Sequence, residues 1–351
     1  MPAGGRLGCG RVSHPGEPVG PAVSQPHPRP RVVVLTTAAT PVPAGLTAWG
    51  GLADVTLSGA AELPDTLPGA DVLLLWDFFS TALRDHWASA SALRWVHVAA
   101  AGVDATLFPE LRRSEVVVTN SAGVFDRPVA EFVLAAVLAH DKQVHVSSAL
   151  QRERRWLHRE VASTAGGRAL VVGTGGIGRA TARLLRAVGM EVRGAGRVGR
   201  RDDPDLGLVV PSDELAEHVG WADHVVLVAP LTPATHHLVG ADVLAAMRPG
   251  AHLVNVGRGA LVDEPALVEA LRTGPLGFAT LDVFEEEPLP WGSPLWTLPD
   301  VAVSAHMCGD VVGWRDRLAA LFEDNLRRYV HGRTLRNVVD LELGYPRAAG
   351  G

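Results

Sequence analysis

The chain has little cysteine and almost no lysine. Only Cys9 and Cys308 occur among 351 residues, and no Cys-x-x-Cys pair is present, which argues against a disulfide framework or a structural zinc site. This cysteine content suits a reducing cytoplasm, where we expect the protein to act. Lys142 is the only lysine among 32 basic residues, a bias typical of a GC-rich coding sequence, so a single arginine carries less functional information than usual.

Long hydrophobic runs and a surplus of one charge are also missing. The apolar segment 132–139 (FVLAAVLA) is far shorter than the roughly 20 residues that span a bilayer. The net charge is −6, with acids and bases spread along the chain rather than gathered into a basic patch. We therefore expect neither a membrane nor a nucleic acid as partner.

Length and composition indicate a globular protein of about two domains. At 351 residues with 47% hydrophobic and 20% charged residues, the chain can bury a large core without disulfides or metals. Residues 1–30 differ, because they are rich in proline and glycine and show no hydrophobic period. We expect this extension to be disordered, and it lacks the apolar core of a signal peptide. A mis-assigned start codon explains it equally well.

Strands alternate with helices from Arg31 onward, a rhythm that favours an α/β fold with parallel sheets. The predicted strands are 31–37, 53–59, 70–78, 94–104 and 115–121 in a first series, and 168–172, 190–196, 224–230, 251–257, 278–284 and 301–306 in a second. The predicted helices are 81–93, 129–152, 176–188, 212–219, 240–247, 263–273 and 311–331. We therefore predict two doubly wound parallel-sheet domains with a cleft between them.

The final helix follows a strand of the second series but has no later strand of its own, so we expect it to return to the first domain. The chain then crosses between domains near 125 and near 305, and a junction with two crossings is a natural hinge and ligand site. The predicted division is an extension (1–30), a substrate domain (31–125 with 306–340), a cofactor domain (126–305) and a tail (341–351).

A glycine-rich turn marks the start of the second series. Gly173, Gly175 and Gly178 form a Gly-x-Gly-x-x-Gly pattern between a hydrophobic strand and an amphipathic helix, the context in which this pattern binds dinucleotides. The first glycine permits the tight turn, the second lets backbone approach a pyrophosphate, and the third lets helix and strand pack closely. The alternative is a turn that packs without a ligand.

The strand after this helix ends without the usual acidic residue for the ribose. Gly196 and Arg197 stand there, with Arg200 and Arg201 just beyond. A carboxylate would repel a 2′-phosphate, whereas a guanidinium binds one through a bidentate fork. The pattern favours NADP(H) as cofactor, with NAD(H) possible. The competing explanation is a solvated arginine run in an arginine-rich protein.

Three later strand ends carry residues suited to carbonyl reduction. Arg258 and Asp282 each follow a strand, Glu287 lies five residues further, and His306 ends another strand. His306 would donate a proton to the carbonyl oxygen, and Glu287 would hold the other ring nitrogen and stabilise the charged imidazole. Arg258 would bind a substrate carboxylate and polarise the carbonyl. Each residue alone has a structural explanation, but three strand-end sites after a dinucleotide turn favour catalysis.

From about residue 31 to 340 the chain resembles the D-isomer-specific 2-hydroxyacid dehydrogenases. The matching segments, in order, are 99–104 (AAAGVD), 120–135, 171–185, 229–240, 247–271, 281–290 and 304–309. The resemblance implies that Arg258, Glu287 and His306 are catalytic. It also implies that Ala101 and Gly102 hold the substrate carboxylate through backbone amides, together with Arg258 and His306.

The same resemblance implies a cofactor-lining role for a loop near Thr235 and a contact between Asp282 and the nicotinamide carboxamide. The predicted cofactor-binding residues are Gly173, Thr174, Gly175, Gly176, Ile177, Gly178, Arg197, Ala229, Pro230, Thr235, Val256 and Asp282. The resemblance further implies a homodimer. No metal is expected.

Two departures from the family pattern bear on function. Ala305 stands where the family commonly has proline before the catalytic histidine. The missing acidic residue makes the cofactor site similar to those of glyoxylate/hydroxypyruvate reductases that use NADPH. The leading prediction is an NADP(H)-preferring reductase of small 2-oxoacids. The alternatives are a non-catalytic, cofactor-sensing protein on the same fold and a dehydrogenase of the formate or phosphite type.

Overall fold

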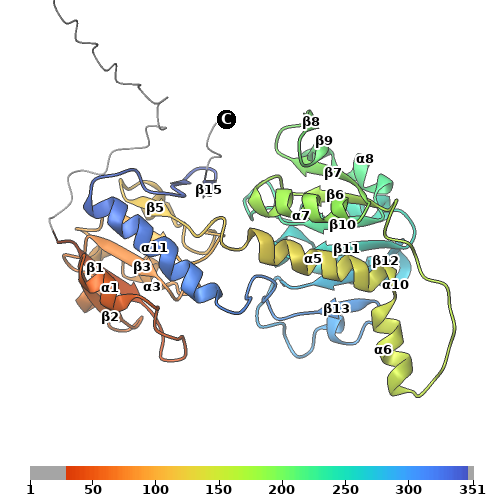
Figure 1. Ribbon diagram of the computed structural model, residues 1–351, viewed down its shortest axis with the longest axis horizontal. Coiled ribbons are helices and arrows are strands. Elements are labelled where there is room, and N and C mark those ends of the chain that lie inside the picture. The colour runs from red at the N-terminus through yellow and green to blue at the C-terminus, as the bar shows by residue number, and fades with distance from the viewer. Residues whose placement is uncertain (1–28, 347–351) are drawn as a thin grey trace, which may run out of the picture.

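The computed structural model describes residues 29–346, which form two lobes joined by two chain segments (Figure 1). The first lobe is built on a parallel sheet with the order β2-β1-β3-β4-β5. Its strands are β1 (Arg31–Leu35), β2 (Asp54–Ser58), β3 (Val72–Leu75), β4 (Trp95–Val98) and β5 (Val117–Thr119). This 2-1-3-4-5 order is that of flavodoxin-like doubly wound sheets.

The second lobe is built on a sheet with the order β13-β12-β11-β10-β6-β7-β9-β8. Its strands are β6 (Arg168–Val172), β7 (Glu191–Gly196), β8 (Arg200–Asp203), β9 (Gly207–Pro211), β10 (His224–Leu227), β11 (Ala251–Asn255), β12 (Leu276–Leu281) and β13 (Val301–Val303). All pairs are parallel except the edge pair β8–β9. With β6 as the first strand the order is that of a Rossmann sheet, so the predicted fold class is confirmed.

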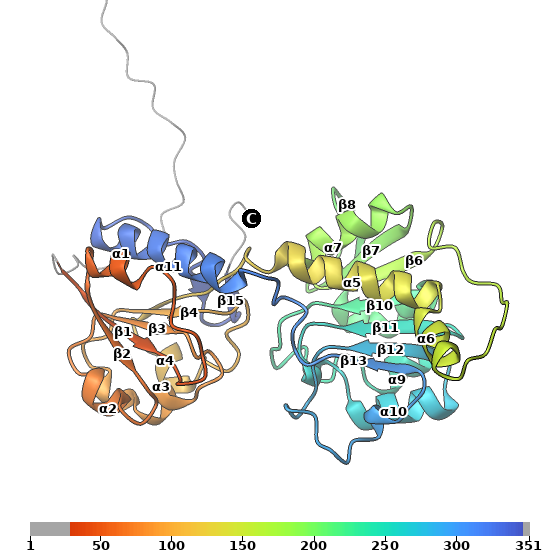
Figure 2. The same ribbon diagram turned by 60° about the horizontal axis from the view of Figure 1, so that its bottom comes forward.

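Helices cover both faces of the first sheet. On one face, α1 (Leu46–Gly50) and α11 (Trp314–Val330) pack against the strands, and the rings of Trp95 and Phe322 stack at 5.3 Å. On the other face lie α2 (Leu63–Thr66), α3 (Ala82–Asp85) and α4 (Pro109–Arg112). The chain's last long helix therefore returns to the first lobe, beside its earliest residues (Figure 2).

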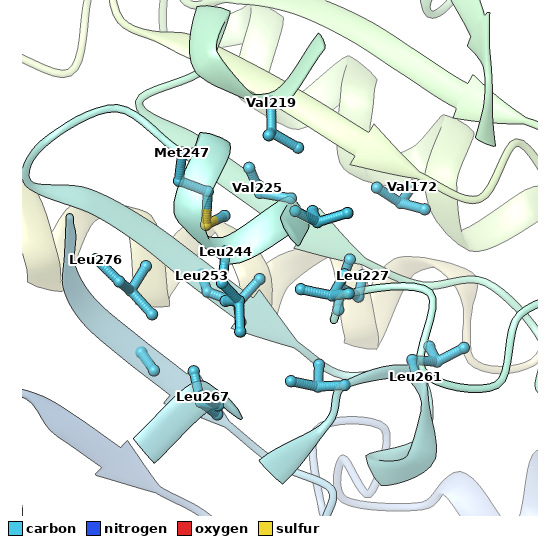
Figure 3. Packing of buried hydrophobic residues seen from close by; sticks show 14 of the residues in the cluster. Val172, Val219, Val225, Leu227, Leu244, Met247, Leu253, Leu261, Leu267 and Leu276 are labelled. Carbon is cyan, nitrogen blue, oxygen red and sulfur yellow. The ribbon is translucent and has the colours of Figure 1, made fainter. Parts of the chain in front are cut away.

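The second sheet is covered in the same way. On one face lie α5 (Asp126–Asp141) and α7 (Gly176–Ala187), and on the other lie α8 (Leu215–His218), α9 (Ala241–Ala246) and α10 (Glu264–Thr273). Leu227, Leu253 and Leu267 are at most 1% exposed in the second of these layers (Figure 3). Strands buried on both faces read as continuous hydrophobic runs, which explains why the sequence pattern found them.

The single helix predicted over 129–152 is wrong, because the structure has two. α5 ends at Asp141, and α6 (Val144–Arg152) begins after Gln143, whose left-handed φ of 49° interrupts the helix. Val133 and Val137 pack α5 against the sheet, whereas α6 buries only Leu150 and leaves Val144 and Val146 exposed. A hydrophobic period continues across the break, so the sequence alone hides it.

The long helix predicted over 81–93 is also wrong, since α3 covers only four residues and a short 3₁₀ turn follows it. Two small features were not predicted, the β8–β9 hairpin and the ribbon of β14 (Val339–Asp340) and β15 (Tyr345–Pro346). The disorder predicted for 1–30 lies outside the described residues up to 28, but Arg29 pairs with Asp54 at 2.6 Å, so that prediction fails at its end. Within 29–346 no helix is long and apolar enough to cross a membrane.

Candidate active site

The residues predicted to do chemistry lie together where the two lobes meet. Arg258 follows β11 and His306 follows β13, at the carboxyl edge of the second sheet, and the 99–104 loop follows β4 at the carboxyl edge of the first. Arg258 of one lobe contacts Asp104 of the other, and the His306 ring contacts Phe79. Carboxyl edges of parallel sheets are where ligands bind in such folds.

Glu287 and His306 form a hydrogen-bonded pair. Nδ1 of His306 lies 2.7 Å from Oε2 of Glu287, and Oε1 of Glu287 accepts a bond from the backbone N–H of Phe284. Burial raises the pKa of the Glu287 carboxyl, but the two hydrogen bonds and the charges of His306 and Arg258 outweigh it, so the pKa lies below its ordinary value. Glu287 is therefore a carboxylate at neutral pH, and Nε2 of His306 is the ring nitrogen left for a ligand.

The turn that carries His306 is held by Asp282. The side chain of Asp282 is buried and accepts bonds from the Ser304 hydroxyl and from the backbone N–H groups of Met307 and Cys308. The backbone N–H of His306 donates to the Asp282 carbonyl at 2.8 Å, and His306 itself adopts a left-handed φ of 49°. Sequence reasoning gave Asp282 a cofactor contact and missed this bracing, which only the spatial path of the 304–308 turn reveals.

The Arg258 guanidinium is held by groups from both lobes. Its Nε lies 3.0 and 3.1 Å from the two carboxylate oxygens of Asp104, and its Nη1 donates to the carbonyl of Gly257 at 2.8 Å. Asn255 braces the turn from behind by donating to the Arg258 carbonyl. Nη2 lies against Gly102, where a Cβ atom would stand 1.7 Å from it, so any larger residue there would displace the guanidinium.

Gly102 is thus next to Arg258, and Ala101 precedes it in the same loop; their expected contact with a substrate carboxylate stays a prediction. The Ala101 carbonyl accepts a bond from the Asn120 side chain, and the Ser121 N–H donates to the carbonyl of Ala100. These two bonds fix the loop against the start of the segment that crosses to the second lobe. Asn120 lay within a matching segment but carried no predicted role, because a side-chain-to-loop contact leaves no pattern in sequence.

Aromatic rings flank the His306 side chain. The ring of Phe79 meets His306 edge-on at 5.7 Å and contacts Phe78, which in turn meets Trp314 at 6.5 Å. Phe79 remains 63% exposed despite these contacts. The rings come from the segment after β3 and from the start of α11, so this wall belongs entirely to the first lobe.

The glycine turn has the geometry that a dinucleotide site requires. Gly173 has φ 118° and no room for a Cβ beside Val228, and a Cβ on Gly178 would stand 1.9 Å from the Gly173 carbonyl. At Gly175, just before α7, nothing lies within 4 Å of a Cβ position. The turn therefore presents open backbone at the N-terminus of a 12-residue helix, which suits a pyrophosphate.

The packing around this turn explains why β7 ends in glycine at position 196 rather than in an acidic residue. Thr174 packs against Gly196, where a Cβ would stand 2.9 Å from its methyl group. Gly176 faces the carboxyl of Asp126, whose pKa is raised by burial, and Ile177 packs into the core beneath α7. A side chain at position 196 would therefore have to displace Thr174, and the strand ends there without a carboxylate.

Arg200 differs from the expectation that it backs the ribose site. Its guanidinium pairs with the buried carboxylate of Asp203 at 2.8 Å, which also receives a two-pronged bond from Arg179. These bonds hold the pKa of Asp203 well below its ordinary value against the opposing effect of burial. Arg197 and Arg201 are exposed, and their side chains make no hydrogen bond or ion pair within 29–346, so they are the arginines of this segment left for a ligand.

The remaining predicted cofactor residues lie along the carboxyl edge of the second sheet. Ala229 and Val256 are buried at the ends of β10 and β11. Pro230 is exposed, and its carbonyl accepts a bond from the Thr235 hydroxyl, which also accepts from the Thr232 N–H. The Thr235 hydroxyl thus shapes the loop by internal bonds.

A large concavity of about 1540 Å³ lies elsewhere, at the opposite edge of the first sheet. Several charged groups at its rim are already partnered: Arg29 pairs with Asp54, and Asp71 accepts from the backbone N–H of Arg31. Neither Arg258 nor His306 lines it. We therefore place the candidate site at the junction of the lobes. Within 29–346 no group of three or more metal-ligating side chains is arranged to hold a metal ion.

Comparison with known proteins places the chain in a family. Residues 134–308 match the family model for the NAD-binding domain of D-isomer specific 2-hydroxyacid dehydrogenases. A glyoxylate reductase from Korarchaeum cryptofilum (strain OPF8) is 34% identical over 270 residues, which cover 75% of this chain and 80% of that protein.

Solved structures of the same family are similar to this chain over most of its length. A D-isomer specific 2-hydroxyacid dehydrogenase from Xanthobacter autotrophicus Py2, in complex with NADPH and MES, is 32% identical with a TM-score of 0.77, covering 90% of this chain and 100% of that one. An NADPH-dependent glyoxylate/hydroxypyruvate reductase from Sinorhizobium meliloti, in complex with NADP and sulfate, is 27% identical with a TM-score of 0.78 over 90% and 100% of the two chains. By sequence, fold and the order of its motifs, this chain belongs to the D-isomer specific 2-hydroxyacid dehydrogenase family.

Proposed function

We propose that the protein reduces a small 2-oxoacid, such as glyoxylate or hydroxypyruvate, to the D-2-hydroxyacid with NADP(H) as the preferred cofactor. The observation that carries the proposal is the meeting of Arg258, Glu287 and His306 at the junction of the lobes. Nδ1 of His306 is held by Glu287 at 2.7 Å, and both Arg258 and His306 act electrostatically on Glu287. One anion-binding group and one proton-transfer pair are what a carboxylate-bearing carbonyl substrate requires.

In the proposed reaction, the carbonyl carbon would receive a hydride, which NADPH would supply when bound, and the carbonyl oxygen would take up a proton, giving the 2-hydroxyacid and NADP⁺. Nε2 of His306 donates that proton and takes it back in the oxidation direction. Glu287 holds the ring in one orientation and stabilises the imidazolium. Arg258 binds the substrate carboxylate beside the Ala101 and Gly102 amides and polarises the carbonyl.

The cofactor would lie along the carboxyl edge of the second lobe. Its pyrophosphate would rest on the backbone of Gly173, Gly175 and the start of α7, where the open space before the helix fits it. Arg197, exposed next to Gly196, would bind the 2′-phosphate of NADP(H). A contact between Asp282 and the nicotinamide carboxamide remains part of the proposal, although its carboxylate is fully buried and already accepts bonds from the 304–308 turn.

The lobes then have separate roles. The first, residues 31–125 with 306–340, is the proposed substrate domain, and the second, 126–305, is the proposed cofactor domain. Their two connections would let the domains close over a bound substrate. The small number of cysteines supports a cytoplasmic location for this enzyme.

The proposal includes a homodimer. Val144, Val146, Trp156, Leu157 and Val161 lie on α6 and the segment after it and are between 45% and 100% exposed. This stretch projects from the second lobe (Figure 1). Clustered exposed apolar side chains typically mark an interface, and we assign this one to a second copy of the chain.

The homodimer is tested by light scattering, which should give twice the chain mass for the wild type. Trp156→Ser should shift the protein toward the monomer. A monomeric wild type would contradict the proposed homodimer.

The catalytic proposal is tested by following NADPH oxidation with a panel of 2-oxoacids that includes glyoxylate and hydroxypyruvate. We expect turnover by the wild type and loss of turnover in Arg258→Ala. Arg333→Ala is the control: it removes an exposed arginine that follows α11 in the first lobe, and we expect wild-type rates. Cofactor binding without turnover of any panel member would instead support a cofactor sensor. Turnover of formate or phosphite alone would support the third class.

A further inference from the structure

The ion pair between Asp104 and Arg258 joins the two lobes at the candidate site. Asp104 follows the 99–103 loop of the first lobe, and Arg258 follows β11 of the second. The Nε atom of Arg258 lies between the two carboxylate oxygens of Asp104, at 3.0 and 3.1 Å. The proposed mechanism uses Arg258 but gives Asp104 no part.

Two of the three guanidinium nitrogens of Arg258 donate hydrogen bonds within residues 29–346, and the third does not. Nε is taken by Asp104, and one hydrogen of Nη1 goes to the Gly257 carbonyl. Nη2 lies against Gly102, with no acceptor among the described residues. A planar guanidinium has a fixed fork, so fixing Nε and Nη1 also fixes where Nη2 points. The two internal bonds therefore aim the free end of the fork at the loop where a substrate carboxylate would lie.

The pair is poorly explained as a simple structural latch. The two side chains are 28% and 27% exposed, so solvent screens part of the attraction between their charges. The Arg258 turn is already braced by Asn255, and the lobes are already joined by two chain segments. What Asp104 adds is control over the rotation of the guanidinium.

We propose that Asp104 is a positioning residue: its carboxylate accepts from Nε of Arg258 across the lobe junction and aims Nη2 at Gly102 for the substrate carboxylate. The inference rests on the proposed function, because it assigns the free end of Arg258 to a 2-oxoacid. Asp104 itself does not touch the substrate. The negative charge of Asp104 also lies near the incoming substrate carboxylate and repels it. Asp104 therefore orients the Arg258 guanidinium at some cost in substrate affinity.

The two contributions of Asp104 are separated by two variants assayed with NADPH and glyoxylate. Asp104→Asn keeps an oxygen that accepts from Nε but removes the charge, so we expect kcat within about threefold of wild type and a lower KM for glyoxylate. Asp104→Ala removes the acceptor, so we expect kcat to fall by about 10- to 100-fold as the guanidinium loses its orientation. The Kd for NADPH should not change in either variant.

Asp65→Asn is the matched control, since Asp65 is an exposed aspartate on α2 of the same lobe. Wild-type kcat and KM in Asp104→Ala would overturn the proposal. So would an equal loss of kcat in both Asp104 variants, because orientation through the accepted hydrogen bond predicts rescue by asparagine.

Crystal structures of the NADPH complexes of the wild type and Asp104→Ala test the inference without activity. We expect Nη2 of Arg258 to leave Gly102 in the variant, and an unchanged guanidinium would overturn the positioning role. If the wild type turned over no 2-oxoacid, the proposed function would fail while these structures still decided how Arg258 is held.

Discussion

Nδ1 of His306 lies 2.7 Å from Oε2 of Glu287, and the backbone of His306 is held in the left-handed region at φ 49°. The first contact comes from a carboxylate 19 residues earlier, and the second is imposed by a turn whose N–H groups bind Asp282. Few residues adopt a positive φ without such support. The ring is therefore held from both its side chain and its backbone, with Nε2 left to serve a substrate.

His306→Asn should abolish turnover and leave cofactor binding nearly intact. Asparagine has no group that exchanges a proton near neutral pH, and general acid catalysis is worth about 10²- to 10⁴-fold in rate. The measurement is kcat with glyoxylate together with the Kd for NADPH from fluorescence titration. Parallel loss of cofactor affinity would show that His306 supports the cofactor site rather than proton transfer. His331→Asn, at an exposed position after α11 in the first lobe, is the control.

Gly175→Ala should preserve the fold and weaken NADPH binding. Nothing lies within 4 Å of the Cβ position at Gly175, so the methyl group meets no protein atom but enters the space proposed for the pyrophosphate. We expect the Kd for NADPH to rise at least about tenfold with an unchanged Tm. Gly292→Ala, also in open space, should change neither quantity. Unaltered NADPH affinity in Gly175→Ala would place the cofactor elsewhere.

Arg197→Asp should shift cofactor preference from NADPH toward NADH. The substitution replaces a proposed phosphate ligand with a group that repels phosphate, and a charge-assisted bond of this kind accounts for about 10- to 100-fold in kcat/KM. The ratio of kcat/KM for the two cofactors is the quantity to measure. Arg333→Asp makes the same charge change at a distant exposed site. A preference ratio unchanged by Arg197→Asp would remove the case for a phosphate-binding arginine.

The protein should lose stability as the pH falls below about 6.5, because of buried histidines at the amino edge of the second sheet. The rings of His140 and His252 stack at 4.4 Å, and Nδ1 of His224 lies 3.2 Å from Nδ1 of His252. Burial lowers the pKa of His252 well below its usual value, and burial with the charge of His224 lowers that of His140.

The direction of this stability change follows from the lowered pKa values. Below pH about 6.5 the unfolded state binds protons at these histidines, and the folded state does not. Stability is therefore present above that pH and lost below it, by up to about 1.4 kcal/mol per pH unit per histidine. Urea midpoints at about pH 8 and about pH 5 measure the loss. His252→Gln should make the pH dependence shallower, and the exposed His236→Gln should leave it unchanged. Identical slopes for wild type and His252→Gln would contradict this account.

The sequence predicted the sheets well because strands buried on both faces are continuous apolar runs, and it predicted the site candidates because they stand directly after such strands. What it missed depends on distances between segments far apart in the chain. The break at Gln143 falls where the sheet beneath α5 ends, and the pairing of Arg200 with Asp203 depends on the β8–β9 hairpin. Asp104 meets Arg258 only because the lobes are placed as they are. The catalytic and cofactor roles of the predicted residues stay predictions.

The most direct test of the account is a crystal structure of the protein with NADPH and oxamate, an unreactive analogue of a 2-oxoacid. We predict Nε2 of His306 within about 3.2 Å of the oxamate oxygen that represents the carbonyl, and the Arg258 guanidinium on the oxamate carboxylate. The nicotinamide ring should lie on the opposite side of the same carbon. An oxamate bound away from both side chains, or a His306 ring directed away from the nicotinamide, would contradict the account.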